Sequence, residues 1–183
     1  MMKAMDWKSA EDFINWYLKL PFTHKLLVPG NHDCFVEMLS KNDYVRKELI
    51  PKDLHLLIDE SIVIDGVKFF GSPYTPEFKN WCFMLNDKEQ KTHWEKIPDD
   101  TDVLITHGPA YGVLDETGEE FNPGNLGCPF LLKRIEELNI KAHLFGHIHG
   151  GYGKDHSNGY IACNGSVLNE RYYMTSTPQL ICL

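Results

Sequence analysis

The sequence has no long hydrophobic run and no excess of basic residues. No apolar stretch approaches the roughly 20 residues that a helix needs to span a bilayer, and the first residues lack the basic region and apolar run of a secretory signal. The formal net charge is -8, whereas nucleic acids and anionic membranes are bound through lysine and arginine. We therefore expect a cytoplasmic protein with neither a membrane-binding nor a nucleic-acid-binding surface.

The cysteines are scattered and form no CxxC pair. Zinc ribbons and disulfide frameworks both depend on characteristic cysteine spacings, so the sequence predicts neither. Free cysteine is among the most often buried residue types, and we expect most of these side chains to be buried thiols. The five cysteines are Cys34, Cys82, Cys128, Cys163 and Cys182.

The composition is that of an ordinary globular protein. The 183 residues are 43% hydrophobic and 24% charged, which is enough apolar material to form a core at this length. We find no internal repeat, low-complexity tract or linker that would divide the chain. A single domain over residues 1–183 is expected.

The chain opens with a predicted helix and a short strand. Residues 9–20 carry apolar side chains at i, i+3, i+4 and i+7, with Ser9 placed to cap the helix and Pro21 placed to end it. Residues 25–28 form a short apolar run that breaks at Pro29-Gly30, the pattern of a buried strand that enters a sharp turn.

The remaining pattern alternates short strands with helices and two long loops. Asp65-Gly66 accepts the positive φ angles of a tight hairpin, helices are expected at residues 87–95 and after Pro129, and residues 71–86 and 108–127 read as loops. Strands are predicted at residues 54–58, 61–64, 67–70, 103–106, 142–145, 160–163 and 179–183.

Three apolar runs end in glycine-containing turns that carry histidine or asparagine. These turns are Gly30-Asn31-His32-Asp33, Thr106-His107-Gly108-Pro109 and Gly146-His147-Ile148-His149. Ligands of open α/β sheets gather at the carboxyl ends of strands. Imidazole nitrogens and an amide oxygen suit divalent transition metals, and glycine lets the backbone approach a metal or a phosphate closely. Metal-assisted phosphoryl chemistry is the natural interpretation.

Each motif alone also has a purely structural explanation. A turn such as Asn31-His32-Asp33 is often no more than a turn with satisfied polar side chains, and His107 alone is a weaker signal. The His147-x-His149 pair is stronger, because strand alternation would place both rings on one face. The other histidines lack such settings and are expected at the surface or packed in the core: His24, His55, His93, His143 and His156.

These motifs also resemble those of a known family. GNHD, THGP and GHIHGGYG are similar, in this order, to the third, fourth and fifth motifs of calcineurin-like metallophosphoesterases. The resemblance continues through Gly71-Ser72-Pro73-Tyr74, Trp81, Gly127-Cys128 and the segment from Asn164 to Tyr172, and it covers nearly the whole chain. It points to the compact, single-domain branch, and it implies a four-layer α/β sandwich of two mixed sheets flanked by helices.

The resemblance further implies a hydrolase that cleaves phosphodiesters or phosphomonoesters of small substrates at a two-metal site. It implies that Asn31, His107 and His147 bind the second metal and that His149 binds the first. His32 would sit beside the phosphate, bind the substrate and donate a proton to the leaving group. The implied cofactors are divalent manganese, iron, zinc or nickel.

Two motifs that precede Asn31 in the family, and that supply half of its metal ligands, are not found before Asn31 in this sequence. The family's two earlier motifs, Asp-x-His and Gly-Asp-x-x-Asp, supply the remaining ligands and the bridging aspartate. Asp6, Glu11 and Asp12 are the nearest acidic residues, and we expect them to be a solvated helix start rather than substitutes. The sequence therefore predicts a domain that is truncated at its N-terminus, lacks its opening strands, binds at most one metal weakly and has impaired activity.

Two classes of function stay open. The first is a phosphoesterase, and the alternative is a non-catalytic remnant or interaction module with the same fold. Residues 73–83 and 108–125 are expected to shape the rim of the pocket, where aromatic side chains either pack the loops or stack on a nucleobase. A homodimer is expected to cover the exposed sheet edge. The rim aromatics are Tyr74, Phe78, Trp81 and Tyr111.

Overall fold

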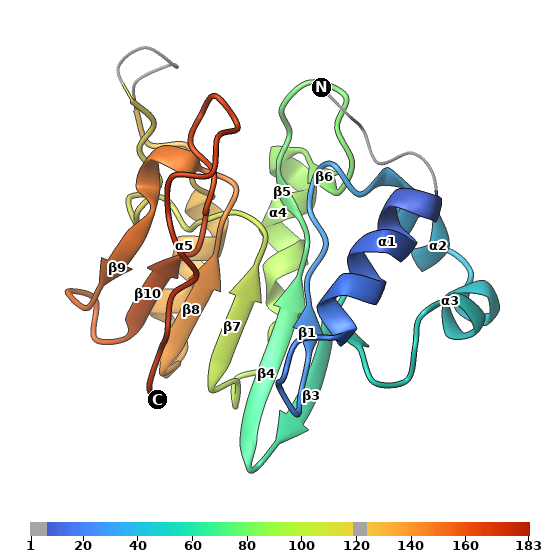
Figure 1. Cartoon of the computed structure of the whole chain (residues 1–183). Helices are drawn as coiled ribbons and strands as arrows, with labels where there is room; N and C mark the ends of the chain where they lie inside the picture. Colours follow the sequence, from blue (N-terminus) through green and yellow to red (C-terminus); the bar gives the residue numbers. More distant parts are fainter. Residues whose placement is uncertain (1–6, 119–123) are drawn as a thin grey trace.

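A six-stranded mixed sheet forms the centre of the molecule, which a computed structural model describes at residues 7–118 and 124–183 (Figure 1). The strands of this sheet and of two smaller sheets are β1 (Leu26–Leu27), β2 (His55–Leu56), β3 (Glu60–Ile64), β4 (Val67–Ser72), β5 (Thr75–Pro76), β6 (Met84–Leu85), β7 (Val103–Thr106), β8 (Ala142–Phe145), β9 (Gly153–Asp155) and β10 (Ile161–Asn164).

The order across the large sheet is β3-β4-β7-β8-β10-β9. The four inner strands run parallel, whereas β3 and β9 pair antiparallel at the two edges. Parallel strands end at the same side of a sheet, which is where ligands collect in such folds. The turns that follow β7 and β8 therefore leave the sheet side by side.

Helices α4 and α5 lie behind the large sheet, whereas α1, α2 and α3 lie to its side, beyond β1 (Figure 1). The helices are α1 (Trp7–Leu18), α2 (Cys34–Ser40), α3 (Asp43–Leu49), α4 (Asp87–His93) and α5 (Pro129–Glu136), with 3-10 turns η1 (Trp94–Lys96) and η3 (His149–Gly151). Within the described residues, no helix is both long and apolar enough to cross a membrane.

The main hydrophobic core lies between α4, α5 and one face of the large sheet. Phe70 and Leu104 face each other across β4 and β7 and are almost fully buried, as are Trp94 and Leu131 from the helical layer. Each large apolar side chain buried in this way stabilises the fold by about 2 kcal/mol or more. This core fixes β7 and β8, which carry two of the three histidine-containing turns, whereas Leu27 of β1 packs against a second buried cluster.

The second sheet layer is present as the parallel pair of β1 and β2. A methyl group on Gly71 would touch the side chains of Leu57 and Val28, so this layer packs tightly on β4. The molecule is a mixed α/β fold of the predicted class. In the described residues the second sheet consists of two strands of two residues each.

Local sequence signals placed several elements correctly. Residues 103–106 and 142–145 coincide with β7 and β8, and β3 and β4 form the predicted hairpin. Asp65 and Gly66 both have positive φ, 50° and 80°, as the tight turn between twisted strands requires.

The first helix differs from the prediction in its start and its packing. It begins at Trp7, so Ser9 lies inside the first turns and does not cap it. Phe13 and Trp16 from the predicted apolar stripe are 44% and 56% exposed, and Ile14 is the buried residue of the helix. The stripe is an aromatic cluster in which the Phe13 ring contacts Trp16 and Tyr17.

The strand predicted at residues 179–183 is wrong. The edge next to β10 is occupied by β9, a strand that was not predicted. Gln179 donates side-chain hydrogen bonds to the carbonyl oxygens of Gly153 and Asn164, so side-chain contacts hold the tail without a backbone ladder. The loop predicted at residues 71–86 likewise contains β5 and β6, which pair in parallel.

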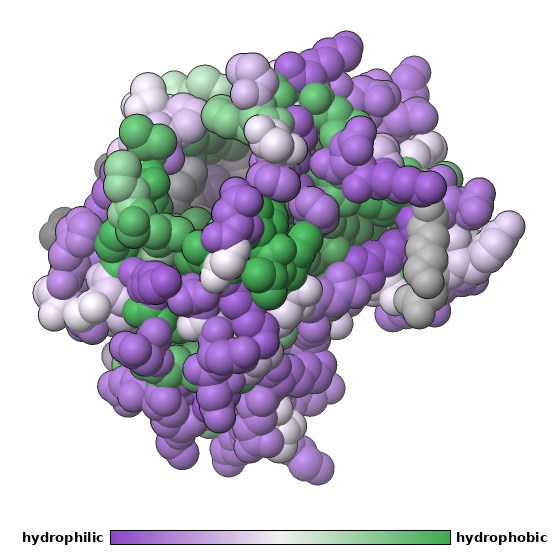
Figure 2. Space-filling model, turned by 90° about the horizontal axis from the view of Figure 1, so that it is seen from below, coloured by the Kyte–Doolittle hydropathy of each residue, from purple (hydrophilic) through white to green (hydrophobic). Residues whose placement is uncertain are grey.

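The lower end of the molecule is mostly hydrophilic. Figure 2 shows this end from below, with hydrophilic residues over most of the surface and hydrophobic residues around a hollow. Strands β7 and β8 point upward in Figure 1. The predicted site therefore lies at the opposite end from the face in Figure 2.

Candidate functional site

The three predicted motifs come together at the carboxyl ends of β1, β7 and β8. The Nε2 atom of His107 lies 2.9 Å from Oδ1 of Asn31, although the two residues are 76 positions apart in the chain. The rings of His107 and His147 are 4.7 Å apart between centroids. The backbone links the turns as well, since Gly146 donates from its N–H to the carbonyl oxygen of His107.

Glycine makes this close approach possible. A methyl group at Gly30 would overlap the ring of His107. One at Gly108 would lie 2.8 Å from Cγ2 of Thr75 and 3.6 Å from the ring of His147. Both glycines therefore leave room for the imidazoles to meet.

His147 sits on a strained turn. Its φ is 69°, and the N–H of Ile148 donates to the carbonyl oxygen of Gly146 at 2.8 Å across it. A γ-turn with positive φ is rare, and such backbone costs of order 1–3 kcal/mol. The strand alternation predicted for His147 and His149 is thus wrong, because β8 ends at Phe145 and η3 begins at His149. The turn directs the two rings instead.

His149 is held with one ring nitrogen committed to the backbone. Its Nδ1 lies 2.8 Å from the carbonyl oxygen of Asn169, and a carbonyl can only accept. Nδ1 therefore carries a hydrogen, and this leaves Nε2 as the ring nitrogen that faces away from the backbone bond, the arrangement of many metal-binding histidines. The ring of Tyr172 also packs against His149 edge-on, at 5.3 Å.

His32 lies beside this cluster, with its ring packed against Trp81. The two ring centroids are 4.5 Å apart and the planes are tilted by 56°. Burial lowers the pKa of His32, while the charge of Asp33 acts in the opposite direction. Asp33 itself fixes the turn, because its Oδ2 accepts a hydrogen bond of 2.7 Å from the N–H of Gly30.

The two central histidines are neutral at pH 7. Burial, reinforced by the other histidines of the cluster, lowers the pKa of His107 well below its usual value and lowers that of His147 to about 4. A neutral imidazole keeps the lone pair that a metal needs. The protonation states therefore favour metal binding at neutral pH.

The donor set fits part of a metal site. Two ligand atoms about 2.1 Å from one ion and roughly at right angles lie about 3 Å apart, close to the distance between Asn31 Oδ1 and His107 Nε2. Yet in residues 7–118 and 124–183 no three histidine, cysteine, aspartate or glutamate side chains form a group that could hold a metal ion. The amide of Asn31 adds one oxygen, so the ligand set is partial.

The acidic residues near the N-terminus give no further ligand in the described part of the chain. Glu11 and Asp12 are exposed on α1, as predicted, but they lie beyond its first turn, so they are not the acidic helix start that was expected. Asp6 lies outside the described residues. His143 and His93 are buried, and His24 and His156 are exposed, as predicted for histidines outside the motifs.

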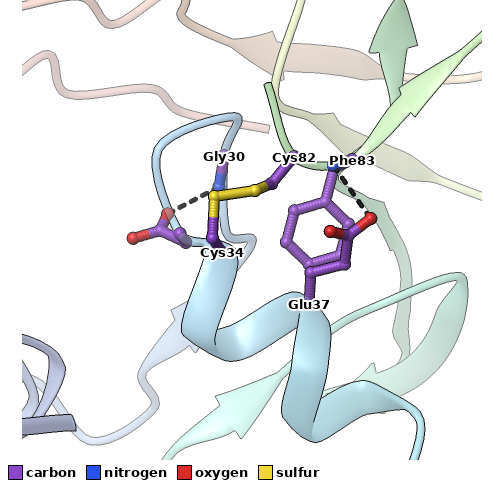
Figure 3. Close-up of a disulfide and its surroundings, with 6 residues drawn as sticks. Gly30, Cys34, Glu37, Cys82 and Phe83 are labelled. Atoms are coloured by element: carbon purple, nitrogen blue, oxygen red, sulfur yellow. Dashed lines mark hydrogen bonds between the residues drawn. A yellow bond between two sulfur atoms is a disulfide. The ribbon is translucent and has the colours of Figure 1, made fainter. Parts of the chain in front are cut away.

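A disulfide joins Cys34 and Cys82, which overturns the expectation that most of the five cysteines are buried thiols (Figure 3). Their Cα atoms are 5.2 Å apart, although 48 positions separate them in the sequence. Cys128 and Cys163 are buried thiols as expected, and Cys182 is an exposed thiol. No local spacing signals the bond, because it depends on how two distant loops pack.

Sequence reasoning also missed two asparagines that support the site. The carbonyl oxygen of Asn169 holds His149, as described above. The side chain of Asn164 is fully buried and donates to the carbonyl oxygen of Ile148 at 2.8 Å, inside the histidine-containing turn. Both residues belong to the segment whose resemblance to the family was noted, but that pattern gave no role to either.

The chain matches a phosphoesterase family over most of its length. A model of the family described as calcineurin-like phosphoesterase matches residues 5–151. Metallophosphoesterase domain-containing protein 1 of Homo sapiens is 31% identical over 197 residues, which cover 95% of this chain and 59% of that protein. Probable rhamnogalacturonate lyase C of Emericella nidulans is 38% identical over 157 residues, which cover 81% of this chain but 14% of that protein.

A solved structure of a protein from Thermus thermophilus shares the fold. It superposes with a TM-score of 0.56 and 16% identity, over 91% of this chain and 72% of that one. The chain spans less than two thirds of the two curated relatives above, so their similarity covers only part of each protein.

Proposed function

Because this chain belongs to the calcineurin-like phosphoesterase family, we propose that it is a metal-dependent hydrolase whose phosphoester site lies at the three histidine-containing turns. The observation that carries this proposal is the meeting of Asn31, His107 and His147, from three separate strand ends, with an oxygen and a nitrogen 2.9 Å apart. The strained backbone at His147 costs free energy of folding, and a role at a functional site would explain why this cost is tolerated.

In this proposal Asn31, His107 and His147 hold one divalent ion, and His149 offers a further nitrogen beside it. Such an ion would act as a Lewis acid toward a phosphoryl oxygen. Manganese, iron, zinc and nickel all suit this mixture of nitrogen and amide oxygen ligands. The hydrogen bond from Nδ1 of His149 to the carbonyl oxygen of Asn169 fixes the tautomer and the orientation of this ring.

His32 is the proposed proton donor to the leaving oxygen. In the protein without bound substrate, the lowered pKa of His32 means that the ring is mostly neutral at pH 7. A phosphate beside the ring would raise this pKa, because a nearby negative charge favours the protonated imidazole. The bound substrate would thus favour the protonated form of His32, its general acid. General acid catalysis typically contributes 10²- to 10⁴-fold in rate.

We propose that the chain alone binds one ion weakly and hydrolyses activated phosphoesters slowly. The support is the partial ligand set, because no group of three or more histidine, cysteine, aspartate or glutamate side chains in the described residues could hold a metal ion. The alternative is a non-catalytic interaction module. The neutral, preorganised histidines favour the hydrolase, since an interaction surface needs neither neutral imidazoles nor a fixed tautomer.

The other expectations also stay proposals. The net charge of -8 favours small phosphoesters over polyanionic nucleic acids as substrates. A homodimer would be visible as twice the monomer mass in sedimentation. A disulfide is uncommon in reducing compartments unless it serves redox chemistry, so a cytoplasmic location would require the Cys34–Cys82 bond to be reversible.

The test combines metal titration with hydrolysis of bis(para-nitrophenyl) phosphate. We expect one weak manganese or zinc site, metal-dependent release of nitrophenol, and a loss of more than about 100-fold in affinity for His147→Ala. His156→Ala, at an exposed histidine outside the cluster, is the matched control and should behave as the wild type. Two tight metal sites would refute the partial ligand set. If the protein shows no metal binding and no hydrolysis, the interaction module is favoured.

A further inference from the structure

A pocket with a basic lining lies at the amino ends of β1 and β2. The two strands run parallel, and Asn31 follows the carboxyl end of β1. In Figure 1 the chain enters β1 from the lower end of the molecule, whereas β7 and β8 point upward. This basic pocket is therefore separate from the histidine cluster. It has a volume of about 450 Å³, and its lining includes Leu18, His24, Lys25, Lys52, Asp53 and His55.

Lys25 is a buried cation in the lining of this pocket. The residue is only 8% exposed, and its Nζ donates one hydrogen bond of 2.6 Å to the carbonyl oxygen of Phe22. Among the residues that the structure describes, Lys25 makes no ion pair with a carboxylate. An ammonium group carries three hydrogens, and a buried charge is normally paired because removing it from water is costly. Two of its hydrogens therefore remain for a ligand.

The other polar groups of the basic pocket suit an anion as well. Lys52 and His24 are exposed, and His55 is partly buried as the first residue of β2. The ring centroids of His24 and His55 are 6.4 Å apart, so both imidazoles can reach one ligand between them. Asp53 is the one carboxylate in the lining, against two lysines. This local excess of positive charge contrasts with the net charge of -8 on the whole chain.

A cation fits the basic pocket less well. In the described part of the chain, no three histidine, cysteine, aspartate or glutamate side chains form a group that could hold a metal ion, and ammonium groups repel one. The carboxyl end of α1 borders the pocket at Leu18 and carries partial negative charge. Two of its last carbonyl oxygens already accept from the N–H groups of Lys19 and Leu20, each at 3.1 Å, which limits this effect.

We propose that the basic pocket binds the phosphate group of a small molecule, with the Lys25 ammonium as its main partner and Lys52, His24 and His55 around it. A phosphate group carries nearly two negative charges and three strong acceptor oxygens, which match donors on several sides better than a carboxylate does. The volume of about 450 Å³ exceeds that of one phosphate ion and is typical of small-molecule pockets. A phosphorylated metabolite is therefore favoured over inorganic phosphate.

The test uses protein freed of metal, so that the histidine cluster cannot hold phosphate through an ion. The ring-proton resonances of His24 and His55, assigned with His24→Gln and His55→Gln, are followed by NMR while ribose 5-phosphate or inorganic phosphate is added. We expect saturable shifts, with ribose 5-phosphate binding more tightly. Equal affinities would keep the phosphate site and make the free ion its ligand. Shifts no larger than those caused by sodium chloride of the same ionic strength would overturn the site.

Charge variants test the role of each group. Lys25→Met should weaken ribose 5-phosphate binding by about tenfold or more, because it removes a charged hydrogen bond. Lys52→Ala should weaken binding and Asp53→Asn should strengthen it, each by about threefold, because each changes the charge beside the ligand by one unit. Both positions are exposed, so these two variants decide the matter if Lys25→Met does not fold. Lys88→Ala, at an exposed lysine on α4, is the matched control and should bind as the wild type does.

The result is separate from the proposed function. His147→Ala should keep the saturable shifts, because His147 lies at the opposite end of the molecule. Saturable shifts in a protein that binds no metal and cleaves no phosphoester would refute the proposed function alone. Absent shifts in a protein that binds manganese and hydrolyses phosphoesters would refute the phosphate site alone. Unchanged affinity in both Lys52→Ala and Asp53→Asn would also overturn the site.

Discussion

The ring of His107 occupies the space into which a side chain at Gly30 would project. Gly30 begins the first of the three glycine-containing turns and His107 lies in the second, so this contact sets how closely the two turns approach. The hydrogen bond between Asn31 and His107 depends on it. A single methyl group at Gly30 therefore tests the assembly of the site.

For Gly30→Ala we expect the His107 ring to be displaced and metal affinity to fall. Overpacking of this kind costs about 1–3 kcal/mol, which urea unfolding would detect. Gly165→Ala is the matched control, because a methyl group there meets the nearest atom at an ordinary 3.7 Å. Equal metal affinity for Gly30→Ala and the wild type would contradict the predicted ligand pair.

A second prediction concerns pH and the buried His143. Thr106 donates its hydroxyl hydrogen to the carbonyl oxygen of Gly108, so the Nε2 atom of His143, 2.7 Å away, must donate to Thr106. Nδ1 is then unprotonated and buried. Burial lowers the pKa of His143 to about 3, whereas the unfolded chain has the usual value of about 6.5.

Because the folded pKa is the lower one, the unfolded state binds more protons between these two values. Stability should be fully present above about pH 6.5 and fall as the pH decreases toward 3, by about 2 kcal/mol at pH 5 from this histidine. His143→Gln keeps a donor for Thr106 but does not titrate. Urea unfolding at pH 7 and pH 5 should show a smaller difference for this variant than for His156→Gln, at an exposed histidine.

The Cys34–Cys82 disulfide should stabilise the fold. A bond that closes a loop of 48 residues raises the free energy of unfolding by roughly 4 kcal/mol in the chain-entropy model. Cys34→Ser/Cys82→Ser should therefore unfold at a clearly lower urea concentration than the oxidised wild type. The reduced wild type should match the double variant, and Cys182→Ser should match the oxidised wild type. Coincident unfolding curves would show that the bond does not form.

A fourth prediction tests the partial ligand set by completing it. An N-terminal extension with a strand bearing Asp-x-His and a loop bearing Gly-Asp-x-x-Asp should raise metal-dependent hydrolysis of an activated phosphodiester by orders of magnitude. The added carboxylates would offset the positive charge of two metal ions and hold the ions at a fixed distance from each other. The same extension with His32→Ala should keep the metals and lose rate. If the extended protein binds two metals but cleaves no phosphoester, the interaction module becomes the better interpretation.

The sequence determined the local parts of this protein. The apolar runs at residues 103–106 and 142–145, and the turn at Asp65-Gly66, follow from side-chain burial and backbone freedom within a few residues. The three glycine-containing motifs were visible for the same reason. Their common position could be anticipated because parallel strands end on one side of a sheet.

Only the tertiary structure decided which distant groups meet around those motifs. The Cys34–Cys82 bond, the Trp81 ring on His32 and the Asn169 carbonyl on His149 each join segments with no shared periodicity. The same holds for β9, which takes the sheet edge predicted for the C-terminal residues. These contacts depend on the path of loops over the completed core, and the free energy of that packing belongs to the whole fold rather than to any segment of it.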